Sequence, residues 1–202
     1  MVPSLAPRAG WRGGFACYPF AMEAQESTGE APQRAAEAVR VLMPSPIGCL
    51  GVELTGTAVT RLRIEPGEAE RRELTALHEI DGSDFLDEVF GRLSEYFAGA
   101  RRKLDLEYNL GPSGLDGFAR RVLKETAKIP YGRTRTCQEL AEAAGRPDAH
   151  REVLSILLKN PIPILIPCHR VVAGRSGIGS YVGGGERKSW LLDLESRGAE
   201  LS

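Results

Sequence analysis

The chain has 202 residues, of which 42% are hydrophobic and 26% are charged, a composition typical of a globular protein with room for one or two domains. No stretch approaches the roughly 20 consecutive apolar residues that cross a bilayer, so a membrane partner is not expected. The four cysteines and three histidines are scattered, which leaves a metal site unsupported and favours a reducing, cytoplasmic (bacterial-type) location.

The formal net charge of −1 is unevenly distributed along the chain. Residues 1–116 hold 12 Lys and Arg against 18 Asp and Glu, net −6, whereas residues 117–202 hold 14 against 9, net +5. The basic half fits a polyanionic partner such as nucleic acid. An excess of this size is also common in proteins that bind none, so the charge alone is weak evidence.

The first part of the chain is predicted to consist of a disordered tail followed by a β-sheet. Residues 1–38 are rich in Pro, Gly, Ala and Glu without periodicity, which predicts a disordered tail. Three short β-like runs separated by turn residues follow, at 39–42, 50–54 and 59–64, and predict an antiparallel meander. Another short strand is an option near Ala76–Ile80.

A helix is predicted to begin at Asp84, because apolar residues recur every four positions and Gly99 then stops the pattern. The ladder consists of Phe85, Val89, Leu93 and Phe97. Packed on the meander, this helix completes a small α/β scaffold domain over residues 39–98. Residues 99–116 are predicted to be a linker, with a strand-like alternation at 104–108.

Residues 117–202 are predicted to form a second, mainly helical domain, so the fold class is α+β. One helix is expected from Phe118 to Lys128, and a final amphipathic helix covers 186–195. Between them, Thr136 and Glu139 have the spacing of a capping box at the start of a short helix.

A second short helix is predicted after a turn at Arg146-Pro147, with Asp148 as its cap and Arg151 within it. Two short helices with so short a connection have the outline of a helix-turn-helix. A plain helical hairpin without DNA binding has the same outline.

The most apolar run, residues 160–172, ends in a cluster of reactive side chains and reads NPIPILIPCHRVV. Its three prolines exclude a helix and predict a stiff, extended segment that fixes Cys168. An isolated buried cysteine is usually inert. Here His169 supplies a base, Arg170 makes the end of the segment electropositive, and the Asn160 amide can tie the backbone together, conditions that favour a nucleophile.

Residues 166–172 (IPCHRVV), preceded by Asn160-Pro161, resemble the signature of the O6-alkylguanine-DNA alkyltransferases, also called methylated-DNA–protein-cysteine methyltransferases. The resemblance extends over about 39–200 and is strong from 116 onward. It implies repair of O6-alkylguanine, and of O4-alkylthymine, in double-stranded DNA by a monomer without a cofactor. The damaged nucleotide is flipped out, and its alkyl group passes irreversibly, once per molecule, to Cys168.

The same resemblance implies a relay around Cys168. His169 would deprotonate Cys168 through a bound water, and Glu195 would orient His169. Lys188 would brace the cysteine segment. The residues that the resemblance assigns to DNA or the flipped base are Arg151, Asn160, Cys137, Arg170, Tyr181, Val182, Gly183 and Lys188.

Several of these positions carry specific expectations. Arg151 would occupy the space that the flipped nucleotide leaves, Tyr181 would lie against the base, and Gly183 would leave room for the alkyl group. Val182 would offer its backbone N–H while its side chain narrows the pocket. Other positions depart from the pattern: Cys137 stands where a tyrosine is usual, Glu152 would repel phosphates, and Leu154 would hold its helix away from the groove floor.

Two other classes of function stay open. One is a damage-binding protein of the alkyltransferase-like kind, which binds without transfer; the presence of Cys168 argues against it, whereas Cys137 and Leu154 argue for it. The other is a Cys-His hydrolase with multiple turnovers, for which the sequence offers no oxyanion hole.

Overall fold

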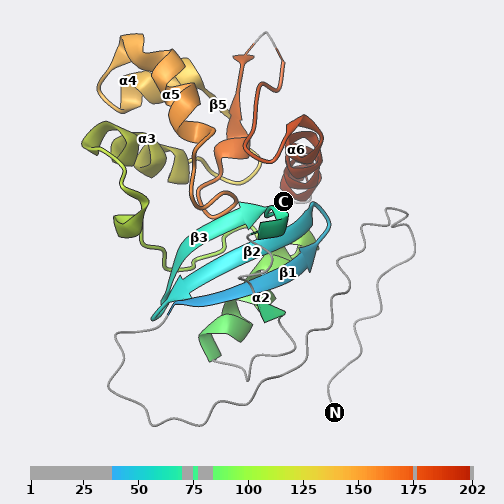
Figure 1. Ribbon diagram of the computed structural model, residues 1–202. Coiled ribbons are helices and arrows are strands. Elements are labelled where there is room, and N and C mark those ends of the chain that lie inside the picture. Colours follow the sequence, from blue (N-terminus) through green and yellow to red (C-terminus); the bar gives the residue numbers. More distant parts are fainter. Residues whose placement is uncertain (1–37, 70–74, 77–83, 175–176, 201–202) are drawn as a thin grey trace, which may run out of the picture. The chain divides into compact units, whose positions relative to one another are not determined.

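The computed structural model describes residues 38–69, 75–76, 84–174 and 177–200 (Figure 1). The tail predicted for residues 1–38 lies, apart from Ala38, outside the described residues. No helix in the described ranges is both long and apolar enough to cross a membrane.

The described chain starts with an antiparallel meander, as predicted. The strands are β1 (Val39–Ser45), β2 (Gly48–Thr55) and β3 (Ala58–Ile64), and β2 lies between the other two. The tight β1–β2 turn requires Gly48, whose φ of +107° is unfavourable for other residues. A fourth, two-residue strand, β4 (Thr75–Ala76), pairs in parallel with β1. β4 includes Ala76, the first residue of the short strand that was considered near Ala76–Ile80. The remaining residues of that range lie outside the described residues.

Helix α2 (Asp84–Phe97) packs on this sheet and has the bounds that its apolar ladder predicts. Figure 1 shows it against one face of the three long strands. Its buried side chains are Leu86, Val89, Phe90, Leu93, Tyr96 and Phe97. Burial of large apolar side chains is worth about 1.5–3 kcal/mol each, so this face anchors the helix.

The strand-like alternation at 104–108 does not form a strand, and that expectation is wrong. Asp105 has a φ of +47°, which interrupts an extended backbone. Only an isolated bridge joins Tyr108 to Val59, whose N–H donates to the Glu107 carbonyl at 2.9 Å. A short 3₁₀ helix, η2 (Gly111–Ser113), follows.

The C-terminal helices begin with α3 (Gly117–Ala127), which the Asp116 carboxylate caps. Helix α4 (Cys137–Ala143) has the full capping box of Thr136 and Glu139. The turn contains a 3₁₀ helix, η3 (Pro147–Ala149), and α5 (His150–Leu157) completes the helix pair. Asp148 lies inside η3 and makes no cap, because the N-cap position of α5 falls on Ala149, one residue further along the chain.

The cysteine segment leads into the last elements. These are η4 (Cys168–Arg170), β6 (Val171–Val172), which pairs in parallel with β5 (Arg135–Thr136), and α6 (Gly185–Glu200). The sheet with its helix and the helical second part confirm the α+β fold class. The predicted domain boundaries stay a prediction.

Candidate active site

The Asn160 side chain organises the cysteine segment. Its Nδ2 donates to the Ile166 carbonyl at 2.9 Å and to the Sγ of Cys168 at 3.1 Å, and its Oδ1 accepts from the Ile162 N–H at 3.1 Å. These bonds hold a backbone in which Ile164 has a φ of +76°, an uncommon value for a β-branched residue. One amide therefore shapes the loop and contacts the sulfur that the loop carries.

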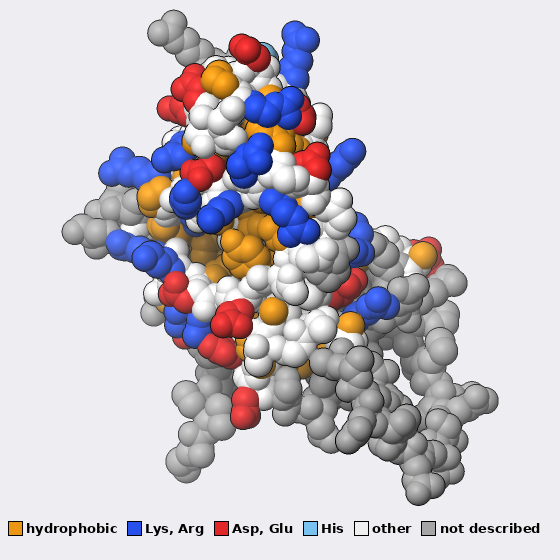
Figure 2. Space-filling view, turned by 90° about the vertical axis from the view of Figure 1, so that its left-hand side faces the viewer, with side chains coloured by type: hydrophobic (Ala, Val, Ile, Leu, Met, Phe, Trp, Pro, Cys, Tyr) orange, Lys and Arg blue, Asp and Glu red, His pale blue; other side chains and the backbone are white. Residues whose placement is uncertain are grey.

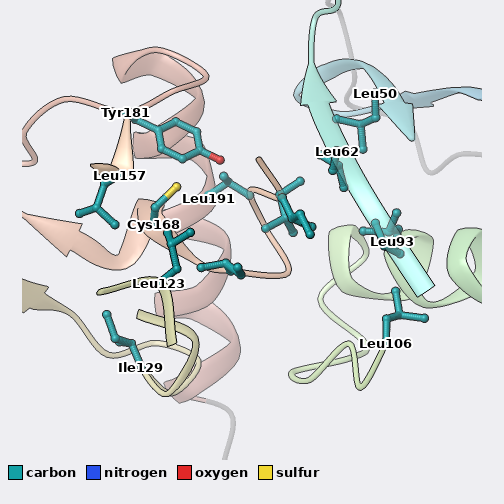
Figure 3. Close-up of a cluster of buried hydrophobic side chains, with 14 of the residues drawn as sticks. Leu50, Leu62, Leu93, Leu106, Leu123, Ile129, Leu157, Cys168, Tyr181 and Leu191 are labelled. Atoms are coloured by element: carbon teal, nitrogen blue, oxygen red, sulfur yellow. The ribbon is translucent and has the colours of Figure 1, made fainter. Parts of the chain in front are cut away.

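Cys168 lines a cavity of about 150 Å³ between α5 and the loop before α6. Leu154 and Leu157 of α5 form one wall, and Val171, Tyr181 and Cys137 line the rest along with a few neighbours. In Figure 3 the sulfur of Cys168 points toward the ring of Tyr181. The cavity is thus mainly apolar and has a thiol in its wall.

Behind Cys168 lies a buried ionic network centred on Glu195 of α6. Its Oε1 accepts from His169 Nε2 at 3.0 Å and from Arg170 Nη2 at 2.8 Å. Its Oε2 accepts from Arg170 Nε at 2.9 Å. The Gly132 N–H adds a bond of 3.1 Å. Burial works against the charge, but the bonds from His169 and Arg170 prevail and hold the pKa of Glu195 at about 2.

These bonds decide which nitrogen of His169 carries the proton. An ionised carboxylate can only accept, so Nε2 is the N–H and Nδ1 keeps its lone pair. Nδ1 is buried and has no hydrogen-bond partner among the described residues. Burial lowers the pKa of His169 despite the nearby Glu195, so the ring is neutral at pH 7 and available as a base.

The Cys168 thiol is protonated at rest. Burial raises its pKa to about 11, although the Asn160 amide and the charge of Lys188 act in the opposite direction. A thiol with this pKa is a poor nucleophile at neutral pH unless a base removes its proton during the reaction. The neighbouring neutral imidazole matches that need.

The expectation that Arg170 contacts DNA is wrong. Only 7% of it is exposed, and its guanidinium is bound to Glu195 and to the Ile129 carbonyl, the latter at 2.6 Å. The guanidinium therefore cannot face DNA, and its positive charge is neutralised by Glu195. The cation that lowers the pKa of Cys168 is Lys188 instead.

Lys188 and Tyr181 connect the cysteine segment (residues 160–172) with the glycine-rich loop before α6 (residues 177–184). The fully buried Lys188 donates to the Val171 carbonyl at 2.5 Å and to the Ser180 carbonyl at 3.1 Å, a geometry that braces the segment. The Tyr181 ring lies edge-on to His169, with 6.1 Å between ring centroids. Its hydroxyl is buried without a hydrogen-bond partner in the described part of the chain.

The two residues after Tyr181 do not line the cavity. Val182 is 39% exposed, so its side chain does not narrow the pocket. A Cβ on Gly183 would come within 2.8 Å of the Tyr181 ring and 3.0 Å of Ile64 on β3. Gly183 thus lets the loop pack between the tyrosine and the sheet, a role other than the expected space for an alkyl group.

The helix pair carries the remaining predicted residues. Arg151 is exposed on α5, and Leu154, 37% exposed, is on the same helix at the cavity. Glu152 forms an ion pair with Arg146 at 2.7 Å, so its charge is offset rather than free to repel phosphates. Cys137 is half-buried at the start of α4.

Two further members of the network, Tyr96 and the Gly132 N–H, could not be found from local sequence patterns. The Tyr96 hydroxyl on α2 donates to Glu195 Oε1 at 2.6 Å and lies 3.4 Å from His169 Nε2. These partners are 99 and 73 residues away. In the sequence, Tyr96 is merely an aromatic residue near the end of an amphipathic helix.

The fold and this site define an α+β protein with a helix-turn-helix outline and a cavity thiol next to a buried His–Glu pair. Residues 117–197 match the family model described as 6-O-methylguanine DNA methyltransferase, DNA binding domain. A methylated-DNA–protein-cysteine methyltransferase of Methanosarcina barkeri is 40% identical over 116 residues, which cover 57% of this chain and 72% of the relative.

Solved structures agree. The crystal structure of Mycobacterium tuberculosis O6-methylguanine methyltransferase is 37% identical, covers 80% of this chain and 94% of its own, and has a TM-score of 0.68. A structure of M. tuberculosis OGT in complex with DNA matches with 34% identity, covers 79% of this chain and 93% of its own, and has a TM-score of 0.67. The chain belongs to the methylated-DNA–protein-cysteine methyltransferase family.

Proposed function

We propose that this protein repairs O6-alkylguanine, and O4-alkylthymine, in duplex DNA by moving the alkyl group to Cys168 once per molecule. The observation that carries the proposal is the Cys168 thiol in the wall of a cavity, next to a buried His169–Glu195 pair in which His169 Nδ1 has no hydrogen-bond partner among the described residues. Family membership and the DNA complex of a relative support DNA as the partner.

The reaction balances with the side chains present. His169 Nδ1 takes the thiol proton through a bound water, and the sulfur attacks the alkyl carbon. The S–C bond forms as the bond from that carbon to the guanine O6 breaks, and guanine leaves with the proton that the thiol gave up. Glu195 stabilises the imidazolium during this step. A thioether on Cys168 has no route back to a thiol, which makes the transfer stoichiometric.

Access to the damaged base requires that its nucleotide leave the stack, which costs a few kcal/mol and less where pairing is impaired. The exposed Arg151 on α5 is near the cavity through Leu154, one turn further along the same helix. In Figure 2 Lys and Arg side chains gather around an apolar hollow, a distribution that suits a phosphate backbone beside an exposed base.

Mass spectrometry tests the proposal. The protein is incubated with excess duplex containing O6-methylguanine, and we expect one added CH₂ on the peptide that holds Cys168, with no further increase over time. Cys168→Ser is the control and should stay unmodified. DNA binding without an alkylated peptide would identify a damage-binding protein, and repeated turnover of an ester without DNA would identify a hydrolase; either result contradicts the proposal.

A further inference from the structure

Tyr96 connects the sheet-bound helix α2 to the reactive centre. Its side chain is 1% exposed, and its hydroxyl makes the shortest hydrogen bond to Glu195 in the network, 2.6 Å to Oε1. Glu195 is ionised, so the hydroxyl must be the donor. A buried phenol beside a carboxylate stays protonated, because burial and then the charge of Glu195 raise the pKa of Tyr96 well above 10.

The phenol oxygen also lies 3.4 Å from His169 Nε2. Its proton points to Glu195, so a lone pair is directed at the ring N–H. That N–H therefore has two acceptors, Glu195 Oε1 at 3.0 Å and the phenol oxygen at a longer distance. Two acceptors on one side of the imidazole fix its plane, and with it the direction of Nδ1.

We propose that Tyr96 is a positioning residue for alkyl transfer, holding Glu195 and the ring of His169 so that Nε2 carries the proton and Nδ1 stays available as the base. The inference rests on the proposed function of Cys168. It gives α2 a part in the chemistry, since the helix that packs on the sheet also supplies a group to the buried relay. Tyr96 does not touch the substrate.

Tyr96→Phe removes the hydroxyl and keeps the aromatic packing, including the edge-on contact with Phe97 at 5.5 Å between centroids. We expect the single-turnover rate with an O6-methylguanine duplex to fall roughly tenfold, as is typical when a group that orients a reacting side chain is lost. The affinity for an unmodified duplex should stay within about twofold, because Tyr96 is buried away from any DNA surface.

The pH profile separates positioning from a general loss of structure. The hydroxyl now shares Oε1 with the ring N–H, and this competition at 2.6 Å outweighs its own weak acceptance from the ring at 3.4 Å. Without the hydroxyl, Glu195 binds the imidazolium more tightly, so the pKa of His169 rises. The acid limb of the rate–pH profile should therefore move to higher pH. The titratable and charged groups that face the ring come from α2, η4, the glycine-rich loop and α6, and are Tyr96, Cys168, Arg170, Tyr181, Lys188 and Glu195. A protein that is merely less folded would lose amplitude without this shift.

Tyr131→Phe is the matched control. Tyr131 packs edge-on to Tyr96 at 6.1 Å, but its hydroxyl donates to the Leu194 carbonyl rather than to Glu195. We expect its rate and pH profile to match the wild type. An unchanged rate for Tyr96→Phe, a loss equal to that of Tyr131→Phe, or an unmoved acid limb would overturn the inference.

A measurement on the native protein covers the case in which Tyr96→Phe does not fold. Nitrogen NMR of His169 should show the Nε2-protonated tautomer, and proton NMR should show a downfield hydroxyl that exchanges slowly. A Nδ1–H tautomer or a rapidly exchanging hydroxyl would overturn the inference. Failure of the native protein to alkylate Cys168 would instead overturn the proposed function, so the two failures are distinguishable.

Discussion

Glu195 shows how single residues set the chemistry. It is 1% exposed and ionised, which would be strongly unfavourable for an isolated carboxylate. Donors from four residues of three separate parts of the chain, Tyr96, Gly132, His169 and Arg170, offset that cost. The same carboxylate therefore fixes the tautomer of His169 and neutralises the buried charge of Arg170.

The ionisation of Glu195 predicts how stability depends on pH. The folded pKa of about 2 lies below the ordinary 4.5, so the stabilisation is complete above about pH 4.5 and is lost as pH falls toward 2. Glu195→Gln leaves Arg170 buried and unpaired, which should cost on the order of 3 kcal/mol at pH 7. Urea unfolding of both proteins from pH 7 to pH 2 measures the difference.

The difference in unfolding free energy between the two proteins should shrink through this acid range. His169, buried and neutral, adds a loss of stability that starts near its ordinary pKa of 6.5 in both. A difference that stays constant down to pH 2 would contradict the prediction, because it would mean that Glu195 is not ionised in the folded protein.

At the scale of elements, the loop before α6 depends on a close approach between parts of the chain. Gly183 packs between the Tyr181 ring and Ile64 of β3, and its carbonyl accepts from Arg187 Nη1 at 3.1 Å. Arg187 also donates to the Ile47 carbonyl at 2.5 Å, in the β1–β2 turn. The sheet thus supports the loop that forms one side of the cavity.

Gly183→Ala should displace this loop. The added Cβ would come within 2.8 Å of the Tyr181 ring, and overpacking of this kind costs about 1–3 kcal/mol. We expect a lower melting temperature and slower transfer, measured by calorimetry and single-turnover kinetics. Gly185→Ala is the matched control, since no atom of the described part of the chain lies within 4 Å of its Cβ position and its φ is not left-handed. Equal behaviour of the two variants would contradict the packing argument.

Elements with a strong local pattern were predictable from the sequence. The apolar residues that recur every four positions from Phe85 predicted α2, and the capping box of Thr136 and Glu139 predicted the start of α4. The 104–108 segment misled because its alternation suits a strand, whereas Asp105 breaks the extended backbone. Asp148 was wrongly predicted to cap α5, because aspartate is common both at helix N-caps and in tight turns such as η3.

The candidate site was predictable only in part, because local signals do not report distant partners. Proline spacing correctly excluded a helix before Cys168, and Asn160 was expected to tie the segment. The prediction that the segment is extended was wrong, because it turns at Ile164, whose φ is +76°, and the Ile166 N–H donates to the Ile162 carbonyl. The charge of Arg170 suggested a surface role, since sequence does not show that Glu195 neutralises it. Tyr96 left no signal, as its partner lies 99 residues away.

At the scale of the whole molecule, charge separates along the chain. Net −6 over residues 1–116 and net +5 over residues 117–202 put the positive charge in the part that holds the helix pair and the thiol. DNA binding that depends on phosphate contacts weakens with salt in proportion to the number of contacts. We therefore expect binding by this chain to be strongly salt-dependent.

Arg151→Gln should reduce the slope of log affinity against log salt by about 1, because the loss of one cation beside the DNA backbone releases roughly one counterion fewer. Fluorescence anisotropy with a short duplex between 50 and 200 mM salt, roughly the range in which such effects are large, measures it. Arg61→Gln is the control: Arg61 is on β3, paired with Glu53 at 3.8 Å, and should leave the slope unchanged. An equal change in both slopes would show that the contact is not specific to α5.

The partners of Glu195 lie far apart in the sequence, so the network can form only late in the synthesis of the chain on the ribosome. A ribosome adds Cys168 and His169 before it adds Glu195, and the carboxylate can join them only after α6 has left the exit tunnel and docked against Tyr96. Until then the imidazole has no fixed tautomer and the sulfur has no oriented base. Under the proposed mechanism, a nascent chain that already contains Cys168 should therefore not react with alkylated DNA until α6 has docked.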